Sequence, residues 1–370
     1  MPRKPLFAIL ALLALIEAGV LLTGFLGRHK PDPAASKPAV GLQDRALPDA
    51  LTTPTLYIEP AANFTWLYTL VNNAKATVDM TMYELVDTTF SADLVAACRR
   101  GVKVRVILDG GLEKKANTPA YSQLSAAGPN CSVAWSNPQF QATHQKTLIL
   151  DGNTAVVMTF NLTSRYYAET RDMALVDTDT ADLGAIQATF NKDFGSTTDL
   201  SYQPDAGHNL IWSPTTAQDD LVSLINNAKS TLLVENEELG APSIVTALTA
   251  ACKRGVKLSL AMTDTSASYH ANYTALEQAG CGVHIGANNA TTLYIHAKAI
   301  VADLGTPNAV GYVGSINFSN ASLTENRELG LYVHDTASLS QIAATITADF
   351  NSFPAYSAAA ALPNTQPALP

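Results

Sequence analysis

The sequence predicts an α/β protein built from two equivalent halves, and two observations carry that prediction. The first is an internal repeat, in which LVNNAKATVDMTMYEL leads to LVAACRRGVKVRVILD and LINNAKSTLLVENEEL leads to LTAACKRGVKLSLAMTD. Lys75 recurs as Lys229 and Cys98 as Cys252, each at an offset of 154 residues, which indicates duplication of a whole domain. The second observation is that helix and strand signals alternate within each half.

The elements follow the same order in both halves. Residues 67–74 are amphipathic, residues 77–83 alternate as a strand does, residues 91–100 are helical up to Gly101, and residues 102–108 form an apolar strand. The second half repeats this order over residues 221–228, 231–235, 244–254 and 257–263. We therefore expect an α/β sandwich in each half, over residues 56–200 and 205–356.

The two ends of the chain differ from this body. Arg3 and Lys4 precede an apolar stretch at residues 6–26, which is long enough for the about 20 residues that span a bilayer. Residues 1–30 are therefore predicted to be a signal peptide or a signal anchor rather than a core helix. Proline-rich residues 31–55 predict a flexible linker, and residues 357–370 a low-complexity tail. We expect the body to be exported to the periplasm or the cell exterior, and anchored to the membrane if residues 6–26 are retained.

Composition narrows the classes of protein that are possible. A chain that is 47% hydrophobic and 15% charged has the material for a substantial core and is not disordered as a whole. Beyond residues 1–30 it carries 19 basic and 31 acidic side chains, a net charge of −12. Affinity for duplex nucleic acid comes largely from Lys and Arg on phosphates, so bulk charge does not hold this body to nucleic acid. A local basic groove remains compatible with that charge.

The four cysteines obey the repeat. Each half has one on the helix before the RGVK segment and one after the next helix. Equivalent folds place equivalent residues together, so the repeat favours the disulfides Cys98–Cys131 and Cys252–Cys281, and export favours their oxidation. Four buried free thiols are the alternative. Metal binding is less favoured, because there is no CxxC and no nearby pair of histidines.

The chemistry lies late in each half. A His-x-Lys is followed after four residues by Asp, then by a hydroxyl and an Asn, and an acid stands eleven residues past each Asn. The two sets are His144, Lys146, Asp151, Thr159, Asn161 and Asp172, and His296, Lys298, Asp303, Ser315, Asn317 and Glu328.

This pattern of residue types has a physical meaning. Alternate residues of an extended segment share a face, so the His and Lys of each motif project together. Two such sets brought face to face surround an anion with donors and little carboxylate, which predicts a phosphate site. One imidazole can attack phosphorus while the other protonates the leaving oxygen, and each acid can orient a ring. Lysines and amides neutralise the charge, so we expect no metal and no other cofactor.

The paired HxKxxxxD motifs, with GSIN after the second, resemble the phospholipase D superfamily in its bilobal form. The resemblance covers about residues 56–355. It implies two α/β/α-sandwich halves related by a pseudo-two-fold axis, with one active site at their junction. It also implies a covalent phosphohistidine resolved by water or an alcohol, with His144 as nucleophile and His296 as general acid.

The remaining roles also follow from the resemblance. It implies that phosphate is bound by Lys146, Lys298, Asn161 and Asn317 with help from Thr159 and Ser315, that Asp172 and Glu328 orient the histidines, and that Asp151 and Asp303 are structural. Two departures stand out: Met158-Thr159 replaces the usual Gly-Ser, and the segment from Asp303 to Gly314 is longer than its counterpart, as in a hairpin insertion. Neither removes a catalytic side chain, which favours an active enzyme over a pseudoenzyme.

An acidic cluster follows one strand of the second half, at Glu235, Glu237 and Glu238, where the active-site face should lie. We interpret it as a solvated turn in preference to a substrate-specificity feature. Tyr83 and Glu84 occupy the matching place in the first half, and the same two interpretations apply to them.

Substrate is the last prediction. We expect a monomer that acts on phospholipids at a membrane surface, by hydrolysis or by phosphatidyl transfer as in cardiolipin synthases. The alternative is an extracytoplasmic nuclease or general phosphodiesterase of the same superfamily, because the FNLTS run is similar to that of small nuclease members. A non-catalytic binding protein would leave the histidines idle. A basic groove would favour the nuclease and an apolar rim the lipid enzyme; the side chains to follow are Lys114, Lys115, Arg165, Arg171 and Arg327.

Overall fold

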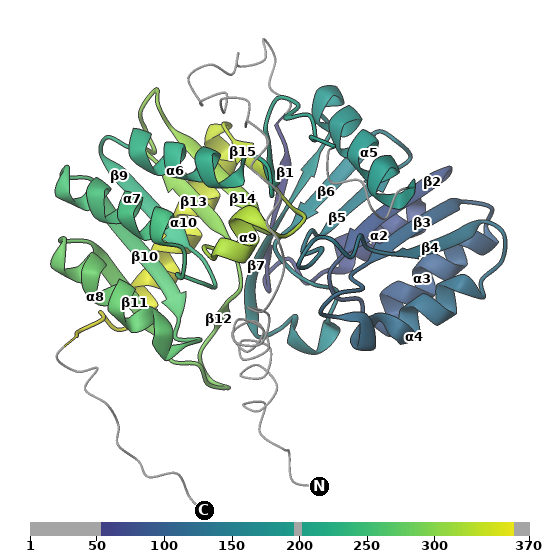
Figure 1. Ribbon diagram of the computed structural model, residues 1–370, viewed down its shortest axis with the longest axis horizontal. Helices are drawn as coiled ribbons and strands as arrows, with labels where there is room; N and C mark the ends of the chain where they lie inside the picture. Colours follow the sequence, from purple (N-terminus) through teal and green to yellow (C-terminus); the bar gives the residue numbers. More distant parts are fainter. Residues whose placement is uncertain (1–52, 196–201, 359–370) are drawn as a thin grey trace, which may run out of the picture.

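The computed structural model describes residues 53–195 and 202–358 as two lobes that follow one another along the chain (Figure 1). The predicted signal segment, nearly all of the linker and the end of the tail lie outside the described residues. Within the two described ranges, no helix combines the length and the hydrophobicity needed to cross a membrane.

The first half contains one mixed sheet with helices on both faces. Its strands run in the order β1-β7-β6-β5-β2-β3-β4, with β2, β3 and β4 parallel and the remaining pairs antiparallel. The elements are β1 (Thr55–Glu59), α2 (Thr65–Asn73), β2 (Thr77–Met82), α3 (Thr88–Arg99), β3 (Lys103–Leu108), α4 (Lys114–Ser125), β4 (Cys131–Trp135), β5 (Thr147–Leu150), β6 (Thr154–Met158), η2 (Ser164–Tyr166), β7 (Thr170–Asp177) and α5 (Thr180–Gly195).

The second half repeats this plan with the strand order β11-β10-β9-β13-β14-β15-β8. Read in reverse, each strand occupies the place of its counterpart in the first sheet, from β8 at the position of β1 to β11 at that of β4. The elements are β8 (Leu210–Ser213), α6 (Ala217–Asn227), β9 (Thr231–Glu235), α7 (Pro242–Lys253), β10 (Lys257–Thr263), η3 (Ala267–Tyr269), α8 (His270–Gln278), β11 (Gly282–Gly286), β12 (Tyr294–Ile295), β13 (Ala299–Ala302), β14 (Val310–Gly314), α9 (Asn320–Thr324), β15 (Glu328–Val333) and α10 (Thr336–Ser352).

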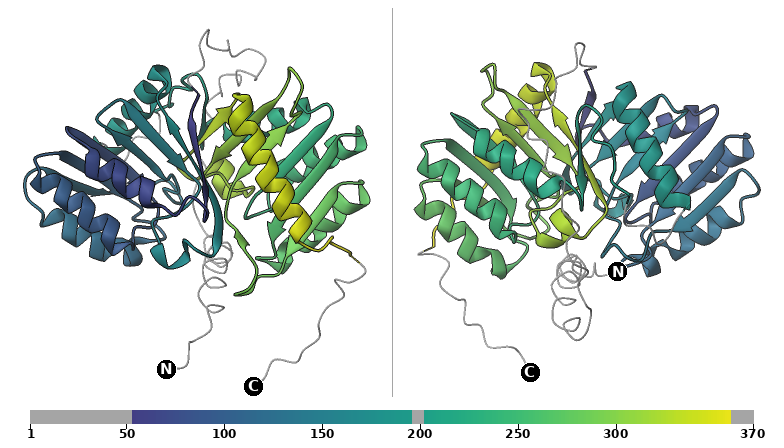
Figure 2. Two further views of the ribbon diagram at one scale, coloured as in Figure 1. Left: turned by 180° about the vertical axis from the view of Figure 1, so that it is seen from behind. Right: turned by 45° about the horizontal axis from the view of Figure 1, so that its top comes forward.

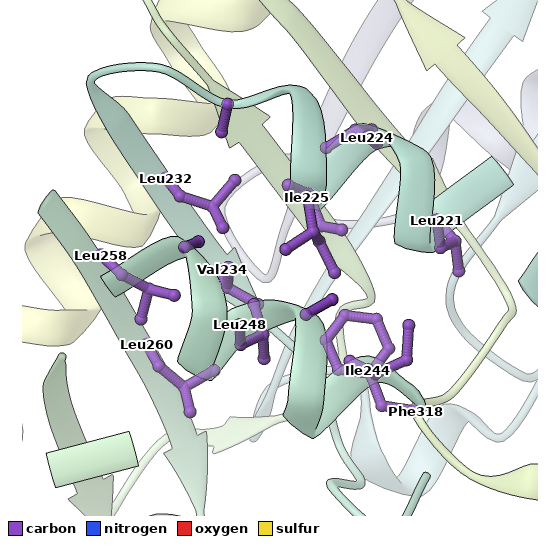
Figure 3. Close-up of a cluster of buried hydrophobic side chains, with 14 of the residues drawn as sticks. Leu221, Leu224, Ile225, Leu232, Val234, Ile244, Leu248, Leu258, Leu260 and Phe318 are labelled. Atoms are coloured by element: carbon purple, nitrogen blue, oxygen red, sulfur yellow. The ribbon is translucent and has the colours of Figure 1, made fainter. Parts of the chain in front are cut away.

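The predicted fold class is confirmed, since each half is an α/β/α sandwich and the halves are related by a pseudo-two-fold axis. The two helices and two strands predicted in each half are present, and β9 and β10 have the predicted bounds. One face of the first sheet packs on α2, α3 and α4, and the same face of the second sheet packs on α6, α7 and α8. The side chains in these contacts are apolar, at helical spacing in the helices and at alternate positions in the strands. Figure 3 shows this core in the second half, where Leu224 and Ile225 of α6 and Leu248 of α7 cover Val234 and Leu260 of the sheet.

A third apolar core joins the halves. It combines side chains from the opposite faces of both sheets, such as Val157 and Leu175 in the first and Val313 and Leu331 in the second, with side chains of α5 and α10. Both sheets therefore have helices on both faces, and the colours in Figure 2 show the lobes meeting along β7 and β14. Part of this apolar surface is buried where the two lobes meet, so the hydrophobic effect stabilises their association.

Two disulfides tie the corresponding helix and strand in each half. Cys98 at the end of α3 bonds Cys131 at the start of β4, and Cys252 at the end of α7 bonds Cys281 just before β11. Their Cα atoms are 5.6 and 5.5 Å apart, in the usual range for a disulfide. The pairing is the one that the repeat favours, and disulfides of this kind persist in oxidising compartments.

The motif aspartates lie in the turns that leave β5 and β13. Asp151 accepts the backbone N–H groups of Lys75, Ala76 and Thr77 at 2.7–3.1 Å, and Asp303 does the same for the three residues that lead into β9. These bonds satisfy the amides where the chain enters a central strand. The turn after Asp303 extends to Ala309, whereas its counterpart ends at Asn153, so the predicted longer hairpin is present.

Candidate active site

Each His-x-Lys segment lies just before a central strand, and each is hydrogen-bonded to the opposite half. Thr143 forms a parallel bridge with Arg327, and the N–H of Gln145 donates to the carbonyl of Arg327 at 3.0 Å. In the second half, β12 pairs in parallel with the start of β7, and the N–H groups of His296 and Ala297 donate to the carbonyl of Arg171. The residue that follows each arginine is the predicted acid, so this pairing brings every acid to the histidine of the other half.

The result is two crossed histidine–carboxylate pairs. His144 Nδ1 lies 2.9 Å from Oε2 of Glu328, and His296 Nδ1 lies 2.8 Å from Oδ1 of Asp172. A carboxylate on Nδ1 fixes the ring and leaves Nε2 as the nitrogen that can react. The two predicted orienting acids are thus brought to the histidines, in a crosswise arrangement that the spacing of the motifs does not reveal.

Burial distinguishes the first histidine. Its enclosed setting lowers the pKa of His144 to about 4, because desolvation disfavours the charged ring more than Glu328 favours it. The nearby cations of Lys146 and Lys298 lower the pKa further. The rings of Tyr83 and His144 pack in a T-shaped arrangement with centroids 4.6 Å apart. His144 is therefore neutral near pH 7 and has an unprotonated nitrogen, as a nucleophile requires.

The two acids are ionised in spite of their burial. Burial acts to raise the pKa of Asp172, but the charge and the hydrogen bond of His296 lower it by more, with help from Lys298. Burial also acts to raise the pKa of Glu328, but the interaction with His144 lowers that pKa by more. Asn326 Nδ2 donates to the second oxygen of Glu328 at 3.0 Å. Each imidazole therefore has a negative partner that can stabilise its charged form.

The two lysines make the same hydrogen bond to the backbone but have different neighbours. Lys146 Nζ donates to the carbonyl of His144 at 2.7 Å, and Lys298 Nζ donates to that of His296 at 2.6 Å. Lys146 lies over the ring of Tyr83 at 4.9 Å, whereas Lys298 forms an ion pair with Glu237 at 3.0 Å. The position that an aromatic ring takes beside Lys146 is thus taken by a carboxylate beside Lys298.

The hydroxyl and amide positions are buried beside these groups. Thr159 donates to Asp172 at 2.6 Å and accepts the N–H of Met173, so its hydroxyl holds the acid of its own half. Ser315 bonds the backbone of Leu329 next to Glu328. The side-chain oxygens of the two asparagines, Asn161 and Asn317, are buried without a hydrogen-bond partner among the described residues.

The acidic cluster is not a solvated turn, and that interpretation is wrong. Glu235 is fully buried, Glu238 is 8% exposed, and Glu237 reaches into the site. The loop is docked because Asn236 accepts the N–H of Glu238 and that of Phe318, which ties it to the segment after β14. In the repeat, Glu237 corresponds to Tyr83 at the offset of 154 residues. This equivalence is the sequence signal by which Glu237 could have been assigned to the site.

Glu237 also corrects the expectation of little carboxylate around the phosphate site. Its Oε2 lies 3.0 Å from Lys298 Nζ, 3.4 Å from Asn317 Nδ2 and 3.6 Å from His296 Nε2, and its Oε1 accepts the hydroxyl of Tyr294 at 2.7 Å. Burial would raise the pKa of Glu237, but Lys298 and His296 lower it well below the usual range. The carboxylate is therefore charged.

Most of the candidate basic side chains for a nucleic-acid groove are engaged elsewhere. Arg171 pairs with Asp349 of α10 at 2.6 Å, and Arg327 pairs with Asp193 of α5 at 2.9 Å, so each arginine joins one half to the last helix of the other. The two remaining engaged cations are Arg165, which lies 3.7 Å from Glu84, and Lys114, which lies over Trp135, while Lys115 is exposed. The described residues thus do not bring these five side chains together as a basic stripe.

Among the residues that the structure describes, no group of three or more His, Cys, Asp or Glu could hold a metal ion. What the junction does contain is two imidazoles, each with a carboxylate on Nδ1, and two lysines. A duplicated α/β/α fold that carries two such motifs defines a class of enzymes that act on phosphodiesters.

The chain belongs to the phospholipase D superfamily. Residues 67–194 and 221–353 both match the family described as "Cardiolipin synthase, PLD-like domain", one match for each half. No curated protein matches the chain by sequence.

Two solved structures show the same fold at low identity. Phosphatidylserine synthase from Haemophilus influenzae is 13% identical with a TM-score of 0.64, over 83% of this chain and 88% of that one. Polyphosphate kinase from Porphyromonas gingivalis is 14% identical with a TM-score of 0.61, over 80% of this chain, which spans only half of the kinase. Nuc from Salmonella typhimurium is 23% identical over 40% of this chain and 95% of its own, with a TM-score of 0.35.

Proposed function

We propose that the protein is a metal-independent phosphodiesterase of phospholipase D type that acts on phospholipids through a phosphohistidine intermediate. The observation that carries the proposal is the crossed arrangement of the two histidine–carboxylate pairs, in which each carboxylate binds Nδ1 and the reaction falls to Nε2 of each ring. The neutral His144 is suited to attack phosphorus, and His296 is suited to hold the proton for the leaving oxygen.

The steps balance as follows. His144 Nε2 forms a bond to phosphorus while the bond from phosphorus to the leaving oxygen breaks, and that oxygen takes the proton of His296 Nε2. Water or an alcohol then gives a proton to His296 and forms the new phosphorus–oxygen bond, while the electrons of the nitrogen–phosphorus bond return to His144. Lys146, Lys298, Asn161 and Asn317 would bind the phosphate oxygens, and Thr159 and Ser315 would support them through the adjoining strands.

Lipid is favoured over nucleic acid by the disposition of charge. Arg171 and Arg327 are used in ion pairs between the halves, and the body carries a net charge of −12. The family description, which names a cardiolipin synthase, supports the same choice. We also propose that the protein works outside the cytoplasm, tethered near a membrane by residues 6–26; the two disulfides support this location.

The test uses vesicles of phosphatidylcholine, phosphatidylglycerol or phosphatidylethanolamine, with residues 31–370 in the presence of EDTA. Release of phosphatidic acid that disappears in His144→Ala is the expected result, and added glycerol would convert part of that product into a phosphatidyl ester if transfer occurs. Single-stranded DNA is assayed in parallel. Cleavage of DNA without lipid turnover would replace the proposal by the nuclease, and turnover that survives in His144→Ala would exclude the mechanism.

A further inference from the structure

An arginine stands directly before each orienting acid, Arg171 before Asp172 and Arg327 before Glu328. The backbone carbonyl of each arginine accepts one or two N–H groups from the histidine segment of the other half. The carboxylate of the next residue binds Nδ1 of the histidine in that segment. The two arginines therefore lie where the backbone and the ring of each histidine are held at once.

The side chains of these arginines reach the last helix of the opposite half through ion pairs of the same geometry. Nε and Nη2 of Arg171 lie 2.6 and 3.1 Å from the two carboxylate oxygens of Asp349 in α10. Nε and Nη2 of Arg327 lie 2.9 and 3.1 Å from those of Asp193 in α5. The arginines are 156 residues apart in the sequence, and so are the aspartates. The duplication thus contains this arrangement twice, and each copy crosses the boundary between the lobes.

Burial makes the two ion pairs directional contacts rather than solvated surface charges. The side chain of Arg327 is 2% exposed, and those of the other three residues are at most 14% exposed. A planar guanidinium that faces both oxygens of a carboxylate fixes the direction of the contact as well as its distance. Burial raises the pKa of Asp193 by more than Arg327 lowers it, so desolvation offsets part of the attraction. Stability alone is therefore a weak reason for burying such a pair twice.

The other neighbours of Arg171 leave Asp349 as its ionic partner. Nη1 of the arginine donates to the carbonyl of Glu59 at 2.6 Å, so each of the three guanidinium nitrogens has an acceptor. Glu235 of β9 is fully buried near the same pair, and the corresponding residue of the first half is Thr81. Burial and the charge of Asp349 raise the pKa of Glu235, which favours its neutral form.

We propose that these two arginines and two aspartates are positioning residues, which hold each histidine in line with its orienting acid. The pair that contains Arg171 serves His296, and the pair that contains Arg327 serves His144. Each ion pair fixes the backbone beside an acid to a helix of the other half, so the acid and the histidine segment keep one geometry where the lobes meet. The effect on rate rests on the proposed function, and the inference adds the residues that keep the two half-sites aligned.

The first experiment removes the charge of one aspartate at a time. Asp349→Asn and Asp193→Asn are compared with the wild type on the phospholipid that the vesicle assay shows to be turned over fastest, and on the same phosphatidyl group esterified to p-nitrophenol. The rate of the first turnover is measured, so that the attack on phosphorus is followed before water is needed. An alkoxide must be protonated as it leaves, whereas p-nitrophenolate need not be.

The two variants should differ in which substrate they affect. Asp349→Asn loosens the proton donor His296, so it should slow the natural lipid about tenfold and the p-nitrophenyl ester less than about threefold. Asp193→Asn loosens the nucleophile His144, so it should slow both substrates about tenfold. An ion pair that only stabilised the fold would not distinguish the two leaving groups.

Asp79→Asn is the matched control. Asp79 on β2 forms a buried, bidentate ion pair with Arg105 on β3, and both residues belong to the first half. The control should lose stability, measured by denaturant titration, without slowing either substrate. Because a lone buried charge can unfold a protein, the double variant Arg171→Met with Asp349→Leu replaces the pair by apolar side chains that restore stability. Apolar contact is not directional, so this variant should show the same selective loss on the natural lipid.

The second experiment needs no turnover. Hydrogen exchange followed by mass spectrometry compares the amides of His296 and Ala297, which bond the first arginine, with the amide of Gln145, which bonds the second. Asp349→Asn should speed exchange about tenfold in residues 294–298 and leave residues 143–147 unchanged. Asp193→Asn should have the reverse effect.

The outcomes separate this inference from the function on which it rests. Equal slowing of the two substrates by Asp349→Asn, a similar loss in Asp79→Asn, or exchange that is unchanged in both histidine segments would overturn the positioning role. Activity that survives in His144→Ala would instead remove the proposed function, and the exchange rates would still decide whether the ion pairs hold the histidine segments.

Discussion

The two halves of this chain share a backbone plan, yet the two histidines have different environments. His144 is enclosed beside Tyr83 and is kept neutral by burial. His296 lies between the carboxylates of Asp172 and Glu237. In both halves the motif precedes a central strand, the lysine donates to the carbonyl of the histidine, and Nδ1 of the histidine bonds to an acid. Duplication therefore supplied the geometry twice, and the side chain at one position beside the motifs differs, Tyr83 in the first half and Glu237 in the second.

The largest expected effects come from removing each histidine in turn, which tests whether the two have unequal roles. His144→Ala should lower turnover of natural lipid and p-nitrophenyl ester alike, by about a thousandfold or more, because no nucleophile remains. His296→Ala should lower the lipid by a similar factor and the p-nitrophenyl ester by far less. Initial rates on both substrates check this, and mass spectrometry at alkaline pH should detect an enzyme that carries a covalent phosphatidyl group only where His144 is present. Equal losses on both substrates in the two variants would contradict unequal roles.

The disulfides test where the halves should be alike. They close segments of similar length, with a sequence separation of 33 for Cys98 and Cys131 and of 29 for Cys252 and Cys281. Replacing both cysteines of a pair by serine should therefore lower the free energy of unfolding by roughly 3–4 kcal/mol in either half, because the unfolded chain gains similar freedom. Denaturant titration of the two double variants measures it. A large loss from one pair and none from the other would show that the halves differ in stability as well as in charge.

The crossed acids can be assigned by a smaller effect. Asp172→Asn and Glu328→Gln should each slow turnover of the natural lipid roughly 10- to 100-fold, because each leaves a histidine without its orienting partner. The assignment comes from the p-nitrophenyl ester in a His296→Ala background. There, Glu328→Gln should still slow the reaction through His144, whereas Asp172→Asn should add nothing, since its histidine is gone. Interchanged outcomes would mean that the acids serve the histidines of their own halves.

The least disruptive test is pH. Burial lowers the pKa of His144 to about 4, so the nucleophile stays neutral well below the 6.5 of an ordinary histidine. The acid limb of kcat/KM, which reports the free enzyme, should therefore show no break near pH 6.5 and fall only toward pH 4. The same shift has a sign for stability: between about pH 6.5 and 4 the unfolded chain binds a proton that the folded chain does not, so stability falls as pH is lowered. An acid limb at pH 6.5 would show that His144 is not buried as described.

Much of this molecule could be predicted from the sequence, because the information is local or repeated. Alternating and amphipathic patterns located the elements, as β9 at Thr231–Glu235 and β10 at Lys257–Thr263 show. Repeat symmetry favoured the cysteine pairs that the structure contains. The motif spacing singled out the two sets of site residues without knowledge of the fold.

The rest depends on contacts between segments far apart in the chain. Which acid serves which histidine is decided where Thr143 meets Arg327 and where β12 meets β7, and neither contact leaves a periodic signal. The acidic cluster was misjudged for a related reason. Charged residues after a strand are usually solvated, but here the side chain of Asn236 and the backbone of Phe318 fold the loop inward.

The crossed pairing has a consequence for how such a site can evolve. If each half were a separate chain, two identical copies would have to meet, and each would lend its acid to the histidine of the other. In that symmetric dimer any substitution appears twice, so a ring beside one histidine would mean a ring beside both. Once the two copies are joined in one chain, Tyr83 and Glu237 can differ, and the donor and acceptor of a proton can become distinct residues.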